Sequence, residues 1–221
     1  PGARPRKSTG AAAPRGKKKP AWQHKGLSRS GRVIVFIESL KLTAGSHAGK
    51  PFRLRDWQKA IVRKVYDPTT PEGLRQVRFV LPTMARKNGK TQLAAGLALA
   101  HLAGPEAEAR GEVYSAASDR NQAARTFREI EAFVSADSAL ADRVNVLRFA
   151  KRIEVLEGPG AGSIYEALSS DARKAHSLSP SCWIFDELAQ AAGRELFDNL
   201  QTGMGAREEP LAIVISPISP D

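Results

Sequence analysis

The segment over residues 82–102, PTMARKNGKTQLAAGLALAHL, constrains the fold more than any other. The residues just before it, VRFVLP (77–82), suit a short strand, and the Ala- and Leu-rich stretch over 90–103 favours a helix. Between the two lies a polar loop that ends in Gly89, Lys90 and Thr91. A strand, a loop and a helix that starts with Gly-Lys-Thr form the context expected of a phosphate-binding loop.

The chemistry of this loop suits a nucleotide. Backbone N–H groups and the positive end of the helix dipole attract phosphate oxygens. Lys90 is expected to reach the β- and γ-phosphates, and the Thr91 hydroxyl to ligate Mg²⁺. The pattern G-x-x-x-x-G-K-[ST] is incomplete, because Met84 stands where it requires glycine. The alternative is an ordinary loop whose basic residues precede a helix.

A second motif, CWIFDELAQ (182–190), places Asp186 and Glu187 at the end of an apolar strand. Charged groups avoid a buried strand unless they have a role there. Asp186 is expected to hold the Mg²⁺ shell, and Glu187 to orient and deprotonate an attacking water. Alone, such a pair is usually the first turn of a helix. Together with the Gly-Lys-Thr loop, in this order, it predicts a nucleoside triphosphatase.

The remaining pattern alternates helices with strands. Helices are predicted within 32–42 and 52–67 and over 90–103 and 119–134, the last with Asp119 as its N-cap. Strands are predicted at 77–82, 112–117, 182–187 and 211–216, with a hairpin formed by 152–158 and 163–169 around PGAG. This order predicts an α/β fold with a mainly parallel sheet that helices flank on both faces.

Charge separates the first residues from the rest. The formal charge of +11 comes from 34 Lys and Arg against 23 Asp and Glu, and residues 1–37 hold ten of the basic residues and no acidic one. Residues 1–30 are expected to be a disordered tail. The tail is either an arm for nucleic acid phosphates or a solvated extension. Residues 31–221 then form the domain.

Other classes of protein find little support in the composition. No apolar run is long enough for a membrane span, and no signal-peptide pattern is present, which predicts an intracellular protein without a membrane partner. Cys182 is the single cysteine, so an intrachain disulfide is excluded, and the four histidines show no zinc-site spacing.

The motifs together resemble the large subunit of tailed-phage terminases. ARKNGKT, EVYSAASDRNQAARTF, CWIFDELAQ and LAIVISPISPD are similar to that family in sequence and order, and the resemblance covers residues 33–221. It implies a P-loop ATPase of the additional-strand type, related to RecA and the helicases, with ATP and Mg²⁺ as cofactors. The implied activity is ATP hydrolysis that drives double-stranded DNA into a procapsid. The implied partners are a small terminase subunit, the portal and further copies in a ring, within the cytoplasm of an infected bacterium.

The resemblance also implies roles for single residues. Gln58 matches the adenine-contacting glutamine, and Arg86 the arginine that senses the γ-phosphate, with Lys87 and Asn88 completing the nucleotide loop. Ser216 matches the segment that couples hydrolysis to movement. A catalytic arginine donated by a neighbouring subunit is expected at Arg173; the rival candidates are Arg143, Arg148 and Arg152.

Two departures from the family pattern keep other functions open. Pro217 stands where a threonine is expected, and the family's nuclease domain is expected to be absent from this fragment, so nuclease activity is not predicted. One alternative is a helicase-like, DNA-stimulated P-loop ATPase. The other is a DNA-binding or assembly module with a decayed nucleotide site, suggested by Met84 and Pro217.

Overall fold

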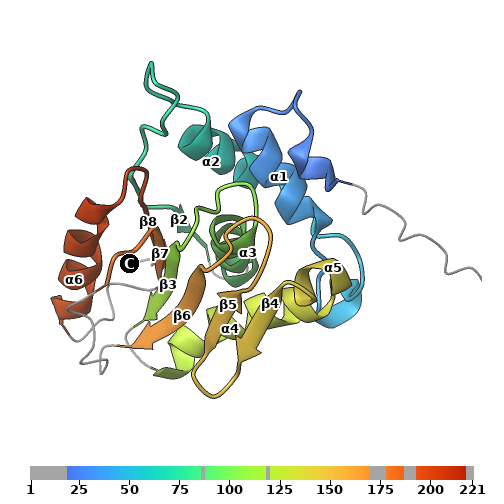
Figure 1. Ribbon diagram of the computed structural model, residues 1–221. Coiled ribbons are helices and arrows are strands. Elements are labelled where there is room, and N and C mark those ends of the chain that lie inside the picture. Colours follow the sequence, from blue (N-terminus) through green and yellow to red (C-terminus); the bar gives the residue numbers. More distant parts are fainter. Residues whose placement is uncertain (1–18, 86–87, 118–119, 170–177, 187–192, 218–221) are drawn as a thin grey trace, which may run out of the picture.

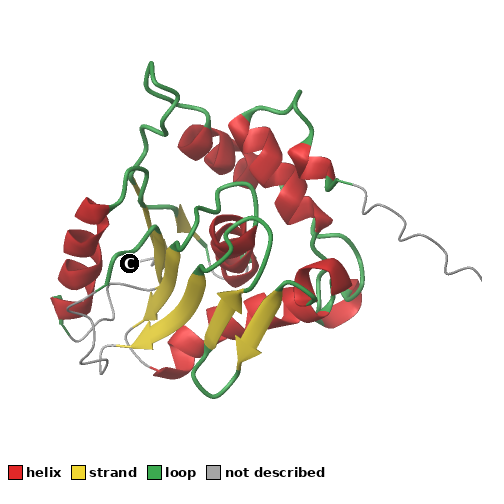
Figure 2. Ribbon diagram, in the orientation of Figure 1, coloured by secondary structure: helices red, strands yellow, loops and turns green. Residues whose placement is uncertain are grey.

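The computed structural model describes residues 19–85, 88–117, 120–169, 178–186 and 193–217 (Figure 1). Its centre is one sheet with helices on both faces (Figure 2). The strands are β1 (Phe79–Val80), β2 (Thr83–Met84), β3 (Glu112–Ala117), β4 (Val144–Leu147), β5 (Arg152–Val155), β6 (Ile164–Ser169), β7 (Cys182–Asp186) and β8 (Leu211–Pro217). The α-helices are α1 (Arg29–Ser39), α2 (Asp56–Tyr66), α3 (Lys90–Ala103), α4 (Arg120–Ser135), α5 (Ser138–Ala141) and α6 (Glu195–Gly203).

The sheet is mainly parallel, as the sequence predicts. Its strand order is β1-β8-β7-β3-β6-β5-β4, and β2 also pairs with β8. The strands from β1 to β6 in this order are parallel, whereas β5 and β4 add an antiparallel hairpin at one edge. Strand β8 therefore lies between the strands that lead to the Gly-Lys-Thr loop and the strand that ends in Asp186. This inserted strand gives the additional-strand arrangement of P-loop folds.

Two apolar layers hold the sheet. On one face, residues of α1 to α5 pack with alternate strand residues such as Val113, Ile184 and Ile213. On the other, α6 packs on Tyr114, Trp183 and Val214. Helix α3 is buried from Leu93 to Ala103, and its small residues allow close approach. A Cβ added at Gly96 would lie 3.2 Å from Ile37 Cγ2, so α1 packs directly on α3.

Most predicted elements are confirmed, and three were missed. The helices α1 to α4 and the β5–β6 hairpin occupy the predicted segments, although residue 119 lies outside the described residues. The strand predicted over 77–82 is instead two short strands, β1 and β2. Pro82 lies between them and has no N–H for a strand ladder. Strand β4 and helices α5 and α6 were not predicted.

Folded structure begins before residue 30. A short 3₁₀ helix covers Ala21–Gln23, and the Trp22 ring lies edge-on to Phe36 with centroids 5.9 Å apart. Ser28 caps α1 through its Oγ, which accepts from the Gly31 N–H at 3.1 Å. Among the described helices, none combines the length and apolar composition that a membrane crossing requires.

Candidate functional site

The Gly-Lys-Thr loop has the backbone that a phosphate-binding loop needs. Gly89 is the N-cap of α3 and has φ 73° and ψ 27°, a left-handed conformation that glycine adopts without strain. A Cβ at Gly89 would meet no atom closer than 3.8 Å, so the backbone angle and not space requires glycine. Lys90 and Thr91 are the first residues of α3 and are half-buried. The N–H groups of this first turn face the end of the helix, where an anion can bind.

Met84 occupies a position that does not need the glycine of the sequence pattern. It lies in β2, pairs in register with Pro217, and its side chain is buried in the core. Its φ is not positive, because the non-glycine residues of the described chain with positive φ are Arg110 and Lys151. An extended, buried position favours an apolar side chain over glycine. This departure from the pattern is therefore compatible with an intact loop.

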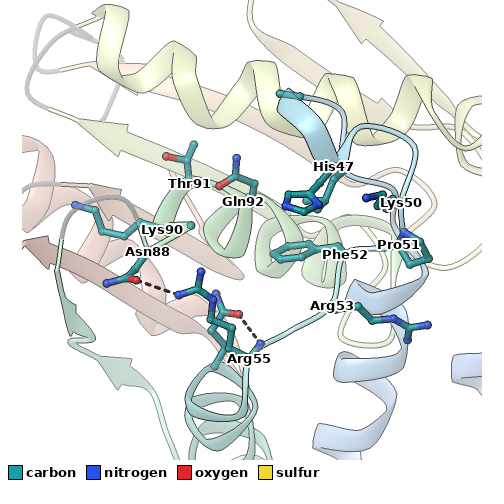
Figure 3. Close-up of a pocket in the computed structure, with 14 residues that line it drawn as sticks. His47, Lys50, Pro51, Phe52, Arg53, Arg55, Asn88, Lys90, Thr91 and Gln92 are labelled. Atoms are coloured by element: carbon teal, nitrogen blue, oxygen red, sulfur yellow. Dashed lines mark hydrogen bonds between the residues drawn. The ribbon is translucent and has the colours of Figure 1, made fainter.

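A cavity of about 850 Å³ opens beside the loop, within the size range of small-molecule sites. Figure 3 shows Asn88, Lys90 and Thr91 on one side of it and His47, Lys50 and Pro51 on the opposite side. Leu42, Ala44 and Phe52 add apolar surface, and Phe52 is held by stacking on Phe133 with centroids 6.0 Å apart. The cavity thus combines cationic and polar side chains on both sides with an apolar wall.

Gln58 reaches this cavity from α2. Its side chain is only 3% exposed, and its Oε1 accepts a hydrogen bond from the Arg55 backbone N–H at 2.9 Å. This bond caps α2 and fixes the amide, so that Nε2 lies 3.9 Å from the Cβ position of Gly89. The structure therefore brings Gln58 together with Asn88, Gly89, Lys90 and Thr91, as the resemblance implies.

The segment before α2 contributes residues that sequence reasoning missed. Arg55 Nη1 donates to Asn88 Oδ1 at 3.1 Å and so ties the α2 side of the cavity to the loop (Figure 3). Arg53 also lines the cavity, but its guanidinium points away from it and lies 3.9 Å from Glu38 Oε2. The density of basic residues in KPFRLR, close to Gln58, is the signal that could have indicated this role.

Asp186 and Ser216 lie at the carboxyl ends of β7 and β8, at the same end of the sheet as the start of the phosphate loop. Asp186 is the last residue of β7, in register with Ala117 on one side and Ile215 on the other. Its Oδ1 atom is buried. Ser216 follows Ile215 and is in register with Thr83 of β2. The carboxyl ends of parallel strands thus converge here, as is typical of ligand sites in open α/β sheets.

Comparison with known proteins decides the family. Residues 56–219 match the family model of the terminase large subunit, ATPase domain. This chain belongs to that family. It is 38% identical over 193 residues to the terminase large subunit of Enterobacteria phage HK97. This alignment covers 86% of this chain and 37% of the relative. The chain thus spans well under half of that relative's length.

Solved structures agree with this assignment. The crystal structure of the HK97 bacteriophage large terminase superposes with a TM-score of 0.74 at 37% identity, over 86% of this chain and 38% of that one. The R139A mutant of the Thermus phage P74-26 large terminase ATPase domain gives a TM-score of 0.57 at 20% identity, over 77% of this chain and 68% of that one. The second match shows the shared terminase ATPase fold.

Several predicted site residues of this terminase domain lie outside the described residues: Arg86, Lys87, Arg173 and Glu187. The three rival arginines are described. Arg143 Nη2 donates to the Ala103 carbonyl oxygen at 3.2 Å. Arg148 pairs with Glu131, and Arg152 with Glu154 and Glu166.

The oxygen donors at the site fit Mg²⁺. Thr91 offers a hydroxyl at the start of α3, and Asp186 a carboxylate at the end of β7. Mg²⁺ usually takes one or two protein oxygens and completes its shell with phosphates and water. Within the described ranges, no group of three or more His, Cys, Asp or Glu residues is arranged to hold a metal. Thr91 and Asp186 supply oxygen donors of the kind that Mg²⁺ takes alongside nucleotide phosphates.

Proposed function

We propose that this domain binds ATP with Mg²⁺ in the cavity beside Gly89 and hydrolyses it to drive double-stranded DNA into a viral procapsid. One observation carries the proposal: the cavity joins Gln58 to Asn88, Gly89, Lys90 and Thr91, next to the sheet edge where β7 ends in Asp186. Membership of the terminase ATPase family supports it.

In this proposal the two ends of the nucleotide meet different groups. The phosphates bind the first-turn N–H groups of α3 and the Lys90 ammonium, with Arg86, Lys87 and Asn88 around them. The adenine meets Gln58. The Gln58 Nε2 donates to adenine N7. The Gln58 Oε1 accepts from the adenine N6 amino group with one lone pair and from the Arg55 N–H with the other. Phe52 and Leu42 supply apolar contact for a base.

The hydrolytic step needs a metal, a base and a positioned water. Thr91 and Asp186 would hold Mg²⁺, which neutralises charge on the β- and γ-phosphates when bound. Glu187 follows Asp186 directly and would orient the attacking water and accept its proton. Arg86 would contact the γ-phosphate. An arginine from a neighbouring copy, for which Arg173 is the candidate, would stabilise charge in the transition state. Such an arginine raises the catalytic rate of related enzymes by roughly 10³-fold to 10⁵-fold.

The proposal extends to the assembly. The partners are double-stranded DNA, a small terminase subunit, the portal of a procapsid and further copies in a ring, in the cytoplasm of the infected bacterium. The basic residues before Arg29 would contact DNA phosphates, and their contribution would fall as salt rises. Arg29 itself pairs with Glu106 and Glu209 inside the fold. Met84, placed in the core of the sheet, supports a working loop over a decayed one.

ATP turnover with and without duplex DNA tests this function. The expected result is Mg²⁺-dependent hydrolysis that duplex DNA stimulates, and protection of DNA inside procapsids when the partners are supplied. Lys90→Ala is the inactive control. Separation of the DNA strands during hydrolysis would favour the helicase-like alternative. Absence of ATP turnover with Mg²⁺, DNA and procapsids would overturn the proposal.

A further inference from the structure

The exposed apolar side chains of this domain lie at the two edges of its sheet. The described part of the chain exposes five large hydrophobic residues: Phe79, Leu81, Leu147, Phe149 and Leu156. The first two belong to β1 and the residue after it, at one edge. The other three belong to the β4–β5 hairpin, at the opposite edge. Phe79 with Leu81, and Leu147 with Phe149, form two candidate contact surfaces, whereas Leu156 lies at the other end of the hairpin.

The hairpin patch consists of Leu147 and Phe149. Phe149 is 95% exposed in the turn between β4 and β5, which projects at the bottom of Figure 1. The turn has a fixed backbone. Lys151 N–H donates to the Arg148 carbonyl oxygen at 3.2 Å, and Ala167 N–H donates to the Lys151 carbonyl oxygen at 3.1 Å. An aromatic ring held in water on an ordered turn is typical of an interface residue.

The β1 patch consists of Phe79 and Leu81. Phe79 pairs in register with Ala212, so it lies on the face of the sheet that α6 covers. Helix α6 covers Ala212 but leaves Phe79 46% and Leu81 56% exposed. Val80, between them, points to the other face and packs against the main core. This segment thus packs Val80 against the core and exposes the side chains of Phe79 and Leu81 to solvent.

The positions of the two patches select the occupant. Within one copy five strands of the sheet lie between β1 and β4, so the patches cannot meet. Two different patches on opposite sides of a molecule fit a heterologous contact, in which each copy uses one patch toward each neighbour. Such contacts build rings when they close. We propose that the hairpin patch of one copy docks on the β1 patch of the next.

This contact would place one copy's hairpin beside the next copy's nucleotide site. Leu81 leads through Pro82 and β2 into the phosphate loop. The hairpin turn lies toward the carboxyl end of the sheet, because β5 runs antiparallel to β6. Glu154 of β5 is opposite Ile164 at the start of β6, whereas Arg152, the residue next to the turn, is opposite Glu166 further along β6. The inference deepens the ring assembly of the proposed function, and it is testable without measuring ATP hydrolysis.

Cysteine crosslinking tests the contact directly. Cys182 is the single cysteine and is buried, and burial also raises the pKa of its thiol to about 12, so the background is low. Leu81→Cys and Phe149→Cys would be treated with a short bis-maleimide, alone and mixed. The expected result is a crosslinked dimer in the mixture, monomer in each single variant, and a ladder of oligomers in the double variant.

The control is Leu156→Cys, which is exposed at the other end of the hairpin, where Leu156 N–H donates to the Arg143 carbonyl oxygen. Mixed with Leu81→Cys, it should give no dimer. Dimers from either single variant alone would show a symmetric contact and overturn the inference. So would equal crosslinking by Leu156→Cys, or monomer in the mixture at every concentration at which the protein dissolves.

Self-association gives an independent measurement. Phe149→Ser should weaken it by roughly tenfold or more in sedimentation, as expected for an anchor residue, whereas Leu156→Ser should leave it unchanged. Binding of ATP to isolated copies should be the same for both variants and the unmodified chain. Failure of ATP hydrolysis with intact crosslinking would count against the proposed function and not against this contact. Unchanged association of Phe149→Ser would contradict the contact.

Discussion

Ser216 lies in parallel register with Thr83, so the last strand of the domain runs directly beside the strand that enters the phosphate loop. The Ser216 N–H donates to the Pro82 carbonyl oxygen at 3.4 Å. One residue earlier, Ile215 is in register with Asp186. Strand β8 therefore pairs both with β2, which leads into the phosphate loop, and with β7, which ends in Asp186. A shift of β8 would move the loop and the carboxylate together.

This relationship predicts a separation of binding from coupling. If Ser216 couples hydrolysis to movement, Ser216→Ala should bind ATP within about twofold of the unmodified chain but lose much of its stimulation by duplex DNA. The substitution removes the hydroxyl and leaves the phosphate contacts of the loop in place. Binding and turnover would be measured in parallel. Ser135→Ala, at the exposed end of α4, is the control. Full stimulation of Ser216→Ala would show that this hydroxyl has no coupling role.

Gln58 should determine the preference for adenine. Gln58→Ala removes the donor and the acceptor that the proposed function assigns to adenine, so the Kd for ATP should rise about tenfold and the ratio of ATP to GTP affinity should fall toward one. Gln201→Ala, exposed on α6, controls for loss of a glutamine. Competition with a fluorescent nucleotide measures both affinities. An unchanged ratio in a folded Gln58→Ala protein would remove the adenine assignment.

Arg55 and Arg53 form a matched pair at the cavity. Arg55 holds Asn88 of the loop, whereas Arg53 points away. Arg55→Ala should therefore raise the Kd for ATP by about fivefold to tenfold, the loss of one charge-assisted hydrogen bond, and Arg53→Ala should change it less than twofold. Equal effects of the two substitutions would mean that only general positive charge matters at this rim.

Stability should fall in mild acid because of His101. Its Nε2 lies 2.9 Å from the Tyr66 hydroxyl, and burial, with the charges of Arg75 and Arg29, lowers the pKa of His101 well below its usual value. The folded state keeps the imidazole neutral, while the unfolded chain takes up a proton below about pH 6.5. The free energy of unfolding should therefore drop below this pH by up to about 1.4 kcal/mol per pH unit.

Urea unfolding at pH 7.5 and at pH 5.5 measures this dependence. His101→Gln retains a polar partner for the Tyr66 hydroxyl and does not titrate, so its loss of stability between the two pH values should be smaller. An identical loss in both proteins would assign the acid sensitivity to other groups.

The sequence predicts those parts of the fold where a segment is almost entirely apolar, and those parts of the site where the chemistry requires particular residue types. The all-apolar CWIF and LAIVI segments become β7 and β8, and the Ala- and Leu-rich stretch becomes the buried helix α3. Gly89, Lys90 and Asp186 were predicted as site residues because phosphate and metal chemistry favour these residue types, and the structure places them at the start of α3 and the end of β7. Gln58 came from the family resemblance, whereas Arg55, Phe52 and the other cavity residues outside the loop were not predicted.

The missed parts depend on tertiary contacts that have no local pattern. Arg55 acts through a hydrogen bond to Asn88, 33 positions away. The strand predicted over 77–82 divides because Pro82 interrupts the ladder, and β2 forms only because the end of β8 lies beside it. Strand β4 is a short edge strand whose outward residues, Asn145 and Leu147, give a weak signal.

The central claim is that ATP binds beside Gly89 and is hydrolysed there, and a comparison of Lys90→Ala with Glu187→Gln tests it most directly. In the proposed function Lys90 contacts the phosphates of bound ATP, whereas Glu187 acts on the attacking water. Nucleotide binding and Mg²⁺-dependent turnover would be measured on both variants and the unmodified chain. The account predicts that Lys90→Ala loses productive binding, while Glu187→Gln binds ATP normally and loses turnover. Normal hydrolysis by Glu187→Gln, or normal binding and turnover by Lys90→Ala, would contradict it.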